Sequence, residues 1–582
     1  MYHLKYLNQF LWKYKNLLII GAIFIIISNI FALYPAEFVR KAFDAVLHSI
    51  KQNTNLSSEI KHTLFKYCGL IVIFAVLKGI FMFFMRQTMI VMSRKIEFEL
   101  KNNIFQQYQK LSMSFYKSNK TGDLMNRISE DVSRVRMYLG PALMYAINIS
   151  VLFYLVITKM ISINPTLTLY VLFPLPILAI TVYFVSKKIN EKSEKVQKQL
   201  SEITTISQEN FSGIKVIKSF GNEKNSWTFF LKSCEKYTQK QIDLVKIEAY
   251  FFPLIITMIG ISTIFTVYVG GIESYKNNIT TGNIAEFIIY INMLAWPVAS
   301  VGWITSILQR AAASQQRINE FLMIKPEIIN TKNKPTKING NIKFKNVSLT
   351  YKDTNITALE NLNFTIKEGS ALGVFGRTGS GKSSIANLIC RLYDANTGIV
   401  SFNNINIKDL NLFSLRLSIG YIPQDGYLFS GSIKDNIGFA KDKINNSNIF
   451  KAAKKAEILD DIENFTNNFN TMIGERGVKL SGGQKQRLAI ARAFYQKPSM
   501  YIFDDCLSAI DAIKERKIIN NLKKEAKGKT SIIISHRITT IKDADHIIVL
   551  DKGKIIEQGN HQSLIKMKGE YYEIYKNQNS SN

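Results

Sequence analysis

Long apolar stretches without charge dominate the first half of the chain. Five of them run for 21 to 27 residues without a charged side chain, and a sixth is interrupted only by Lys78. At 1.5 Å per residue, each can cross the roughly 30 Å hydrocarbon core of a bilayer as a helix. The pattern therefore predicts six membrane spans, at about 16–36, 67–88, 137–158, 160–186, 249–272 and 287–309.

The basic residues between these stretches predict their orientation. Segment 86–136 carries ten Lys and Arg residues and segment 187–248 carries twelve, whereas the three opposite loops carry five, one and one. Because basic loops stay in the cytoplasm, we expect both termini to be cytoplasmic. The first span is long for a signal peptide and lacks a small-x-small site, so we expect it to remain as a helix.

The two basic segments are also the longest connections between spans. Their apolar residues recur at helical spacing, for example over 96–105, which predicts antiparallel helical stalks reaching roughly 30 Å below the membrane. Residues 115–125 break the first stalk, and Gly213 and Gly221 punctuate the second. These breaks are candidate contact tips.

Lys78 is the one charge inside the apolar stretch 67–85 of the second predicted span. An ionisable residue there is a functional-site candidate that faces a cavity. The alternative is that its ammonium group snorkels to the membrane surface along the aliphatic stem.

The chain changes character after Lys325. Residues 326–340 are polar and are expected to link a transmembrane domain at 1–325 to a second domain at 341–582. In the second domain, strand-like runs alternate with helical ones, which predicts an α/β fold. The fold class expected is therefore multi-domain, with an all-α six-helix transmembrane domain bearing long cytoplasmic extensions, followed by an α/β domain.

Composition excludes several classes. Hydrophobic residues make up 47% of the chain and charged residues 20%, which is too apolar for a disordered protein. The net charge of +30 is spread evenly over both halves, so no basic arm suggests a nucleic-acid partner. The four cysteines form no close pair, so we expect reduced thiols with neither disulfide nor zinc site.

The second domain contains a phosphate-binding motif at residues 376–383. The strand-like run 371–375 leads into Gly-Arg-Thr-Gly-Ser-Gly-Lys-Ser, and 384–392 looks helical. In this setting backbone N–H groups converge on phosphate oxygens at a helix N-terminus. Lys382 would reach the β- and γ-phosphates and Ser383 would bind Mg²⁺. We expect ATP and Mg²⁺ as cofactors, held by Gly376, Arg377, Thr378, Gly379, Ser380, Gly381, Lys382, Ser383 and Ser384.

Two further apolar runs end in polar side chains. The run from Met500 ends at Asp504, a carboxylate suited to Mg²⁺ coordination. The run 531–535 ends at His536, a candidate γ-phosphate contact for which a structural role is the alternative.

The sequence Leu-Ser-Gly-Gly-Gln at 480–484 carries a family resemblance. It resembles the signature of ATP-binding cassette (ABC) ATPases, and nearly the whole chain resembles a half-size ABC exporter of the multidrug and lipid-flippase type. Segments 121–125 and 209–214 are similar to that family's intracellular-loop motifs. The resemblance implies an ABC ATPase domain and an enzyme that couples ATP hydrolysis to export.

The resemblance also implies roles for single residues. Tyr351 would stack on adenine, and Gln424 would contact Mg²⁺ and the stalks. Residues 474–477 resemble a loop specific to exporters, and 508–511, ending at Asp511, resemble the D-loop. The family works as a dimer of cassettes that enclose two ATP molecules. The signature residues that would contact ATP held by the opposite subunit are Ser481, Gly482, Gly483 and Gln484.

One residue departs from the family pattern. Where the family usually has a Glu that positions the attacking water, this chain has Asp505. Its carboxylate is withdrawn by about 1.5 Å, and a misplacement of about 1 Å can slow a reaction on the order of a hundredfold. We therefore expect slow hydrolysis at this site. Asp505 resembles the degenerate-site subunits of heterodimeric exporters, and the alternative is a homodimer that tolerates Asp.

These inferences combine into one functional prediction. The chain is expected to export or flip a hydrophobic or amphipathic drug or lipid across a plasma membrane of the bacterial inner-membrane type. It would act beside membrane lipids as one half of a dimer, heterodimeric in preference to homodimeric. A homodimeric exporter with slow hydrolysis, a nucleotide-gated channel and a non-transporting sensor are the alternatives. The catalytic candidates are Lys382, Gln424, Asp505 and His536, and the metal ligands are Ser383, Gln424 and Asp504.

Overall fold

The chain folds into two compact units. The computed structural model describes residues 2–51, 58–332, 334–441, 443–474, 480–507 and 510–580. The first unit comprises 1–107 and 122–324, and the second comprises 108–121 and 325–582. The tip of the first basic segment therefore belongs to the same unit as the second half of the chain.

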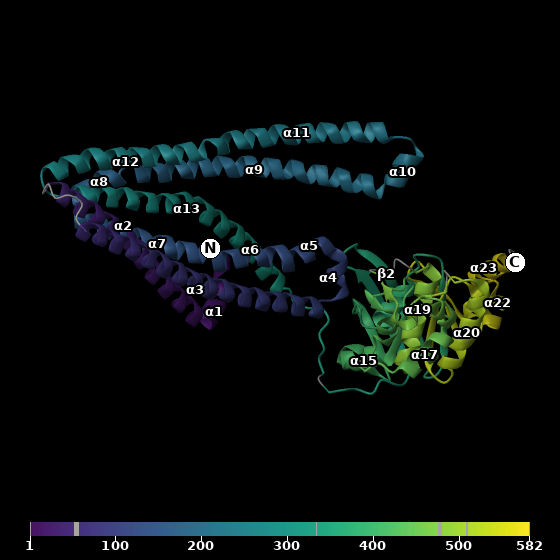
Figure 1. Cartoon of the computed structure of the whole chain (residues 1–582). Coiled ribbons are helices and arrows are strands. Elements are labelled where there is room, and N and C mark those ends of the chain that lie inside the picture. Colours follow the sequence, from purple (N-terminus) through teal and green to yellow (C-terminus); the bar gives the residue numbers. More distant parts are fainter. Residues whose placement is uncertain are drawn as a thin grey trace. The chain divides into compact units, whose positions relative to one another are not determined.

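The described part of the first unit consists of helices, most of them long (Figure 1). Six helical rods are long and apolar enough to cross a membrane, which confirms the six predicted spans. The rods are Lys15–Ile50, Ser58–Lys110, Thr121–Ile163, Pro165–Ser212, Glu223–Tyr275 and Thr281–Leu322. The helices of this unit are α1 (Asn8–Lys13), α2 (Lys15–Lys51), α3 (Ser58–Lys110), α5 (Thr121–Asn126), α6 (Val132–Met137), α7 (Leu143–Ile163), α8 (Pro165–Leu172), α9 (Pro174–Ser212), α10 (Ile214–Ser219), α11 (Glu223–Ala249), α12 (Phe251–Tyr275) and α13 (Thr281–Leu322), of which α1 and α10 lie outside the rods.

Prolines set several of the boundaries between these helices. Pro165 and Pro174 occupy the first positions of α8 and α9, where a missing N–H costs nothing. The Asn164 side chain caps α8 by accepting a hydrogen bond from the Leu167 N–H at 2.8 Å. The fourth rod therefore starts at Pro165 and is divided once, at Phe173 between α8 and α9.

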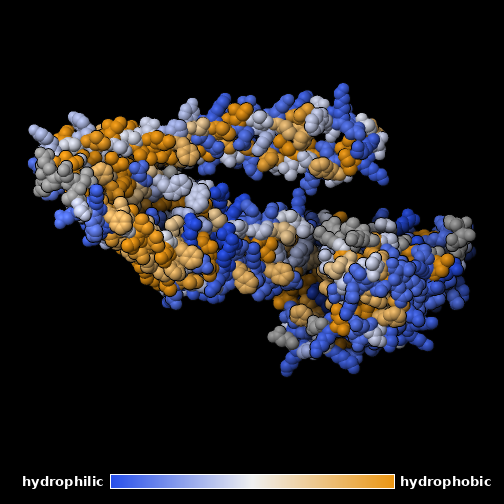
Figure 2. Space-filling view, in the orientation of Figure 1, coloured by the Kyte–Doolittle hydropathy of each residue, from blue (hydrophilic) through white to orange (hydrophobic). Residues whose placement is uncertain are grey.

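The outer surface of the transmembrane helices is apolar. Phe65 and Phe83 on α3 are exposed, and Figure 2 shows hydrophobic side chains gathered over this part of the molecule. The side chain of Lys78 is exposed as well. Since the most apolar stretch of α3 is hardly buried within its own chain, its surface there suits lipid or a second subunit.

Buried ion pairs tie α13 to the other spans. Arg40 of α2 approaches the fully buried Glu286 with 3.1 Å between Nε and Oε2. Nearer the C-terminal end of α13, Arg317 forms a bidentate pair with the buried Asp131. Pairs of this kind fix the register of helices because breaking either one leaves a buried charge.

The second basic segment forms a helical hairpin. Helices α9 and α11 run side by side, and α10 closes their shared end (Figure 1). Phe211 and Phe220, which flank α10, are 76% and 82% exposed. The predicted contact tip is therefore a short helix with uncovered aromatic rings beside it.

The second unit is an α/β domain, as predicted. Its central sheet has the order β12-β11-β3-β10-β9-β6, with β11 through β6 parallel and β12 antiparallel at the edge. An antiparallel sheet has the order β2-β1-β4-β5, and β7 pairs with β8. The strands are β1 (Ile342–Tyr351), β2 (Ile356–Ile366), β3 (Ala371–Gly376), β4 (Thr397–Phe402), β5 (Ile405–Asn406), β6 (Ile419–Ile422), β7 (Gly431–Ser432), β8 (Met472–Ile473), β9 (Met500–Asp504), β10 (Thr530–Ile534), β11 (His546–Asp551) and β12 (Lys554–Gly559).

Helices cover these sheets and enclose two main cores. One core lies between the two larger sheets and α14, and the other joins α17, α19 and α20 to the outer strands of the central sheet. The helices of this unit are α4 (Met113–Ser118), α14 (Lys382–Ile389), α15 (Leu412–Ser418), α16 (Ile433–Gly438), α17 (Asn446–Lys455), α18 (Leu459–Glu463), α19 (Gly482–Gln496), α20 (Ala512–Ala526), α21 (Ile538–Ile541), α22 (His561–Met567) and α23 (Glu570–Ser580).

Candidate ATP site

The phosphate loop, residues 376–383, connects β3 to α14. Gly381 caps α14 with φ of +98°, and a Cβ there would lie 2.2 Å from the Ala358 carbonyl oxygen. Only glycine fits this close approach. The helix expected over 384–392 consequently starts earlier, at Lys382, and ends at Ile389. Its N-terminal N–H groups point into the loop, where a phosphate would be favoured.

Three donors of the loop have distinct environments. The Lys382 Nζ donates to the carbonyl oxygens of Gly376 and Arg377, both at 2.8 Å, and its burial lowers its pKa. The Ser380 hydroxyl is buried and has no hydrogen-bond partner among the described residues. The exposed Arg377 pairs with Glu570, and Thr378 and Gly379 are exposed. An orphaned hydroxyl beside a half-buried ammonium group suits a polyphosphate, which needs both donors and charge.

The predicted metal ligands Ser383 and Asp504 converge. The Ser383 hydroxyl donates to Asp504 Oδ1 at 2.8 Å, and the Asp504 carboxylate is buried at the end of β9. Burial raises the pKa of this carboxyl group, although the bond from Ser383 opposes the rise. A hydroxyl and a carboxylate in contact are oxygen ligands of the type that Mg²⁺ takes alongside phosphate oxygens. The residues present therefore fit the metal.

Asp505 and His536 meet across the ends of adjacent strands. His536 Nδ1 lies 2.9 Å from Asp505 Oδ2, and the Asp505 N–H donates to the Ile534 carbonyl at 2.9 Å. The backbone of Asp505 has φ of +44°, the left-handed region that side chains other than glycine rarely adopt. The sequence placed both residues beside the phosphate loop, and the structure adds that they contact each other.

Tyr421 is a site residue that the sequence reasoning missed. Its hydroxyl donates to Asp504 Oδ2 at 3.2 Å from the neighbouring strand β6, and burial raises the pKa of this phenol. The signal available was its place at the end of an apolar run, just before the predicted Gln424. Only the strand order, which puts β6 beside β9, could show the contact.

Tyr351 lies at the end of β1, next to α14. Its hydroxyl shares a hydrogen bond with the Ser384 hydroxyl at 2.9 Å and accepts one from Asn387 at 3.2 Å. The ring packs edge-to-face with Tyr393, with 5.0 Å between centroids. The predicted adenine platform is thus fixed against the helix that follows the phosphate loop.

The signature sequence caps α19. The Ser481 hydroxyl accepts from the Gln484 N–H, and the Gln484 side chain accepts from the Ser481 N–H at 3.0 Å, which forms a capping box. Gln484 also donates to Asp461, which pairs with the buried Arg487 at 2.6 Å. Burial tends to raise the pKa of Asp461, but the bonds from Arg487 and Gln484 prevail and lower it to about 2. Gly482 and Gly483 form the first turn of α19.

Other predicted residues lie apart from this cluster. The Gln424 side chain is exposed and makes no hydrogen bond to Ser383 or Asp504 in the described part of the chain, while its carbonyl accepts from Gln486 at 3.2 Å. Asp511 caps α20 by accepting from the Lys514 N–H. Residues 475–477 of the exporter-type loop and 508–509 of the D-loop lie outside the described residues.

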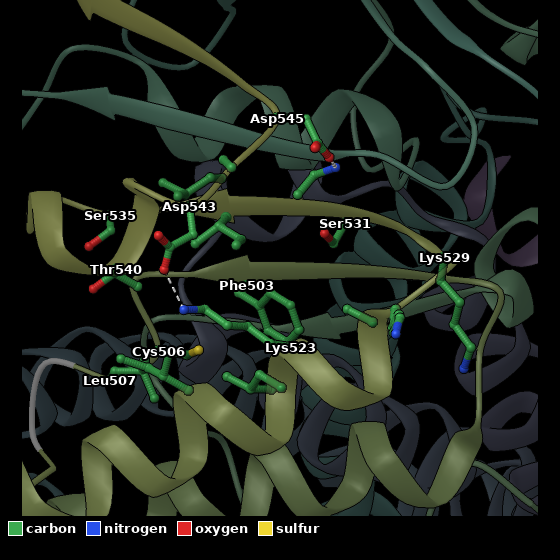
Figure 3. A pocket seen from close by; sticks show the side chains of 18 of the residues that line it. Phe503, Cys506, Leu507, Lys523, Lys529, Ser531, Ser535, Thr540, Asp543 and Asp545 are labelled. Carbon is green, nitrogen blue, oxygen red and sulfur yellow. Dashed lines mark hydrogen bonds and ion pairs between the residues drawn. The ribbon is translucent and has the colours of Figure 1, made fainter. Parts of the chain in front are cut away.

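A separate cavity of about 270 Å³ lies between α20 and strands β9 and β10 (Figure 3). Phe503, Cys506 and Leu507 form part of its wall, and Lys523 pairs with Asp543 at 2.5 Å across its rim. Asp505 is the one predicted site residue among those that line it. The cavity is therefore distinct from the phosphate loop.

Six apolar membrane helices fused to an α/β phosphate-loop domain with an Mg²⁺-type carboxylate define a membrane transport ATPase. Residues 18–298 match the family described as ABC transporter transmembrane region, and residues 359–508 match the family described as ABC transporter. The chain belongs to the ABC transporter family. It is a half-size exporter with fused transmembrane and ATP-binding domains, and it is an ATP-hydrolysing transport ATPase.

Relatives cover nearly the whole chain. A probable multidrug resistance ABC transporter ATP-binding/permease protein, YheI of Bacillus subtilis, is 31% identical over 99% of this chain and 97% of its own length. An ATP-dependent lipid A-core flippase of Syntrophus aciditrophicus is 30% identical over 87% of this chain and 84% of its own. The solved structure of a bacterial Atm1-family ABC exporter with ATP bound shares the fold, with a TM-score of 0.79, 23% identity and 98% coverage of both chains.

Proposed function

We propose that the chain exports or flips an amphipathic lipid or drug from the cytoplasmic side of a bacterial plasma membrane. The observation that carries this proposal is a cavity of about 710 Å³ within the first unit. Five aromatic residues line it, together with smaller polar side chains. The aromatic residues are Tyr145, Phe251, Phe252, Trp296 and Trp303. A pocket of this size and lining suits a largely apolar ligand.

The polar part of the cavity favours an amphipathic ligand. Glu248 and Arg310 also line it, and neither side chain has an ion-pair partner among the described residues. Glu248 directly precedes the span 249–272, and Arg310 directly follows the span 287–309. In the predicted orientation, both lie at the cytoplasmic ends of these spans. A ligand with one polar end would have a counterpart there, and its apolar body would lie among the aromatic rings.

ATP supplies the work in this proposal. Lys382, Ser380 and the N-terminus of α14 would hold its phosphates, Tyr351 its adenine, and Ser383 with Asp504 the Mg²⁺ ion. Bound Mg²⁺ would neutralise charge on the phosphate oxygens. His536 and Asp505 would orient the attacking water, and Gln424 would join them only after moving. Nucleotide that binds the closed dimer more tightly than the open one shifts the population toward closure.

The partner is proposed to be a second half-transporter. The aromatic side chains beside α10, Phe211 and Phe220, are exposed, as is Trp227 on α11. An exposed aromatic cluster at the end of a long hairpin favours docking on another protein surface. We propose that the ATPase domain of the second subunit covers it, and Asp505 favours a subunit of different sequence with its own catalytic Glu.

Transport into inverted membrane vesicles tests the proposal. A fluorescent phospholipid or an amphipathic dye should accumulate only with MgATP, and the Lys382→Met variant should abolish accumulation. Passive current through the purified protein would indicate a channel instead. ATP hydrolysis without movement of any ligand would indicate a sensor. Copurification from native membranes, with mass analysis, would show whether the partner is a second sequence.

A further inference from the structure

The tip of the first cytoplasmic segment is anchored beside the end of β1. On α4, the Ser114 hydroxyl donates to Glu327 Oε2 at 2.6 Å. Glu327 in turn pairs with Lys352 at 2.7 Å, one residue after Tyr351. These bonds lower the pKa of the Glu327 carboxyl, with the bond from Lys352 the largest cause. The tip therefore packs against the nucleotide-binding unit through a chain of charged contacts next to the adenine platform.

Lys117, at the C-terminal end of α4, covers the platform itself. Its Nζ lies 4.7 Å from the centre of the Tyr351 ring and 5.6 Å from that of Tyr393. An ammonium group over an aromatic face is attracted by the ring quadrupole, and the attraction is worth about 0.5–1 kcal/mol at exposed sites. Lys117 is exposed and has no carboxylate partner among the described residues. Its ammonium group contacts the rings of Tyr351 and Tyr393 instead.

The orientation of the Tyr351 ring is fixed by its other end. The hydroxyl is bound to Ser384 and Asn387 on α14, so the ring cannot swing away from Lys117 without breaking those bonds. Tyr351 is half-buried, and the exposed Lys117 lies over it from the solvent side. A purine that stacks on the face that Lys117 covers would meet its ammonium group.

We propose that Lys117 and the adenine base compete for the face of Tyr351. The inference rests on the proposed role of Tyr351 in nucleotide binding. Stacking of adenine displaces the Lys117 ammonium group and removes one attachment of α4 to the nucleotide-binding unit. Because α4 is joined through short segments to the long helix α3 before it and to α5 after it, the first cytoplasmic segment responds to the base of the nucleotide separately from its phosphates.

Equilibrium binding to the full-length protein tests the competition. Lys117→Met should bind MgATP about two- to fivefold more tightly than the wild type, since the base no longer displaces a cation. Binding of inorganic tripolyphosphate, which has no base, should be unchanged. Lys117→Arg keeps a cation over the ring and should bind MgATP like the wild type. Lys120→Met is the control, because Lys120 lies on the same loop with no ion pair or ring contact in the described residues.

A double variant separates the competition from a general charge effect. In the Tyr351→Ala background, Lys117→Met should no longer change the affinity for MgATP. Weaker binding of both MgATP and tripolyphosphate by Lys117→Met would mean that Lys117 attracts phosphate, and would overturn the proposal. So would an unchanged affinity for MgATP, or the same change in Lys120→Met. Failure of the wild type to bind MgATP at all would instead contradict the proposed nucleotide site.

Discussion

The phosphate loop and the signature helix belong to the same domain, but their polar side chains bond to different partners. Around the loop, Ser383 of α14 and Tyr421 of β6 converge on Asp504 at the end of β9. In the signature, Ser481 and Gln484 bond to each other and to Asp461. Within the described residues, no hydrogen bond or ion pair joins segment 480–484 to segment 376–383. In the proposed dimer, the loop would be one half of an ATP site, assembled inside the chain, and the signature would be the other half, presented to the partner.

This difference supports the proposal that a single chain needs a partner. A signature helix whose capping residues are satisfied locally is a preformed N-terminus, ready to meet an anion carried by another molecule. In the proposed dimer, that anion would be the γ-phosphate of ATP on the opposite subunit. Substitutions at the loop and at the signature should therefore have separable effects.

The largest effect is expected at Lys382. Lys382→Met removes the charge nearest the proposed phosphates and should lower the ATPase rate by about a hundredfold or more, by analogy with the loss of a transition-state donor. The rate is measured on purified protein in lipid. Lys454→Met, an exposed lysine with no ion pair among the described residues, should leave the rate unchanged. If Lys382→Met still hydrolyses ATP at the wild-type rate, the phosphates of the hydrolysed ATP do not bind at Lys382.

The Asp505→Glu variant should hydrolyse ATP faster. The longer side chain restores about 1.5 Å of reach, so we expect a gain of about tenfold to a hundredfold in the homodimer. The matched control is Asp409→Glu at an exposed position. If the Glu variant is no faster, Asp505 is a tolerated substitution and the preference for a heterodimer loses its support.

The Tyr421→Phe variant should shift the acid limb of activity. Burial raises the pKa of Asp504, and the bond from Tyr421 opposes that rise by stabilising the carboxylate. Removal of the Tyr421 hydroxyl should raise the pKa of Asp504 further. As the pH is lowered, the variant should therefore lose Mg²⁺-dependent activity at a pH up to about one unit higher than the wild type does. Tyr501→Phe is the control, because its buried hydroxyl has no partner among the described residues. An unshifted pH profile would contradict the role of Tyr421.

The smallest effect is expected from Asp461→Asn. The substitution removes the charge that pairs with the buried Arg487, and should destabilise the ATPase domain by about 1–3 kcal/mol. A lower thermal midpoint of the full-length protein measures it. Asp460→Asn, at the neighbouring position with no ion pair in the described residues, should have little effect. Equal stability of the two variants would show that the Arg487 pair does not hold α19.

Local patterns predicted much of this structure. Uncharged runs are enough to identify six spans, since length and polarity alone decide whether a helix can cross a bilayer. The phosphate loop and β9 were also predictable, because their chemistry follows directly along the chain from a strand. Asp504 and Ser383 could be assigned from these contiguous motifs before their contact was known.

The remaining features depend on contacts between distant segments. Tyr421 reaches Asp504 only because β6 lies beside β9, and Arg487 reaches Asp461 from another helix. The grouping of α4 with the second unit likewise depends on Glu327, far along the chain. No local periodicity carries such information, because the pairing is decided by the packing of whole elements.

Complementation between two inactive variants tests most directly whether the two halves act across chains. Lys382→Met disables the loop half, and Ser481→Ala disables the signature half. When both variants are coexpressed and copurified as mixed dimers, one of the two composite sites contains an intact loop and an intact signature. We predict that these dimers regain up to about half of the ATPase rate expected from two sites, while each variant alone stays near background. Mixed dimers as inactive as either parent would show that loop and signature act within one chain, and would contradict it.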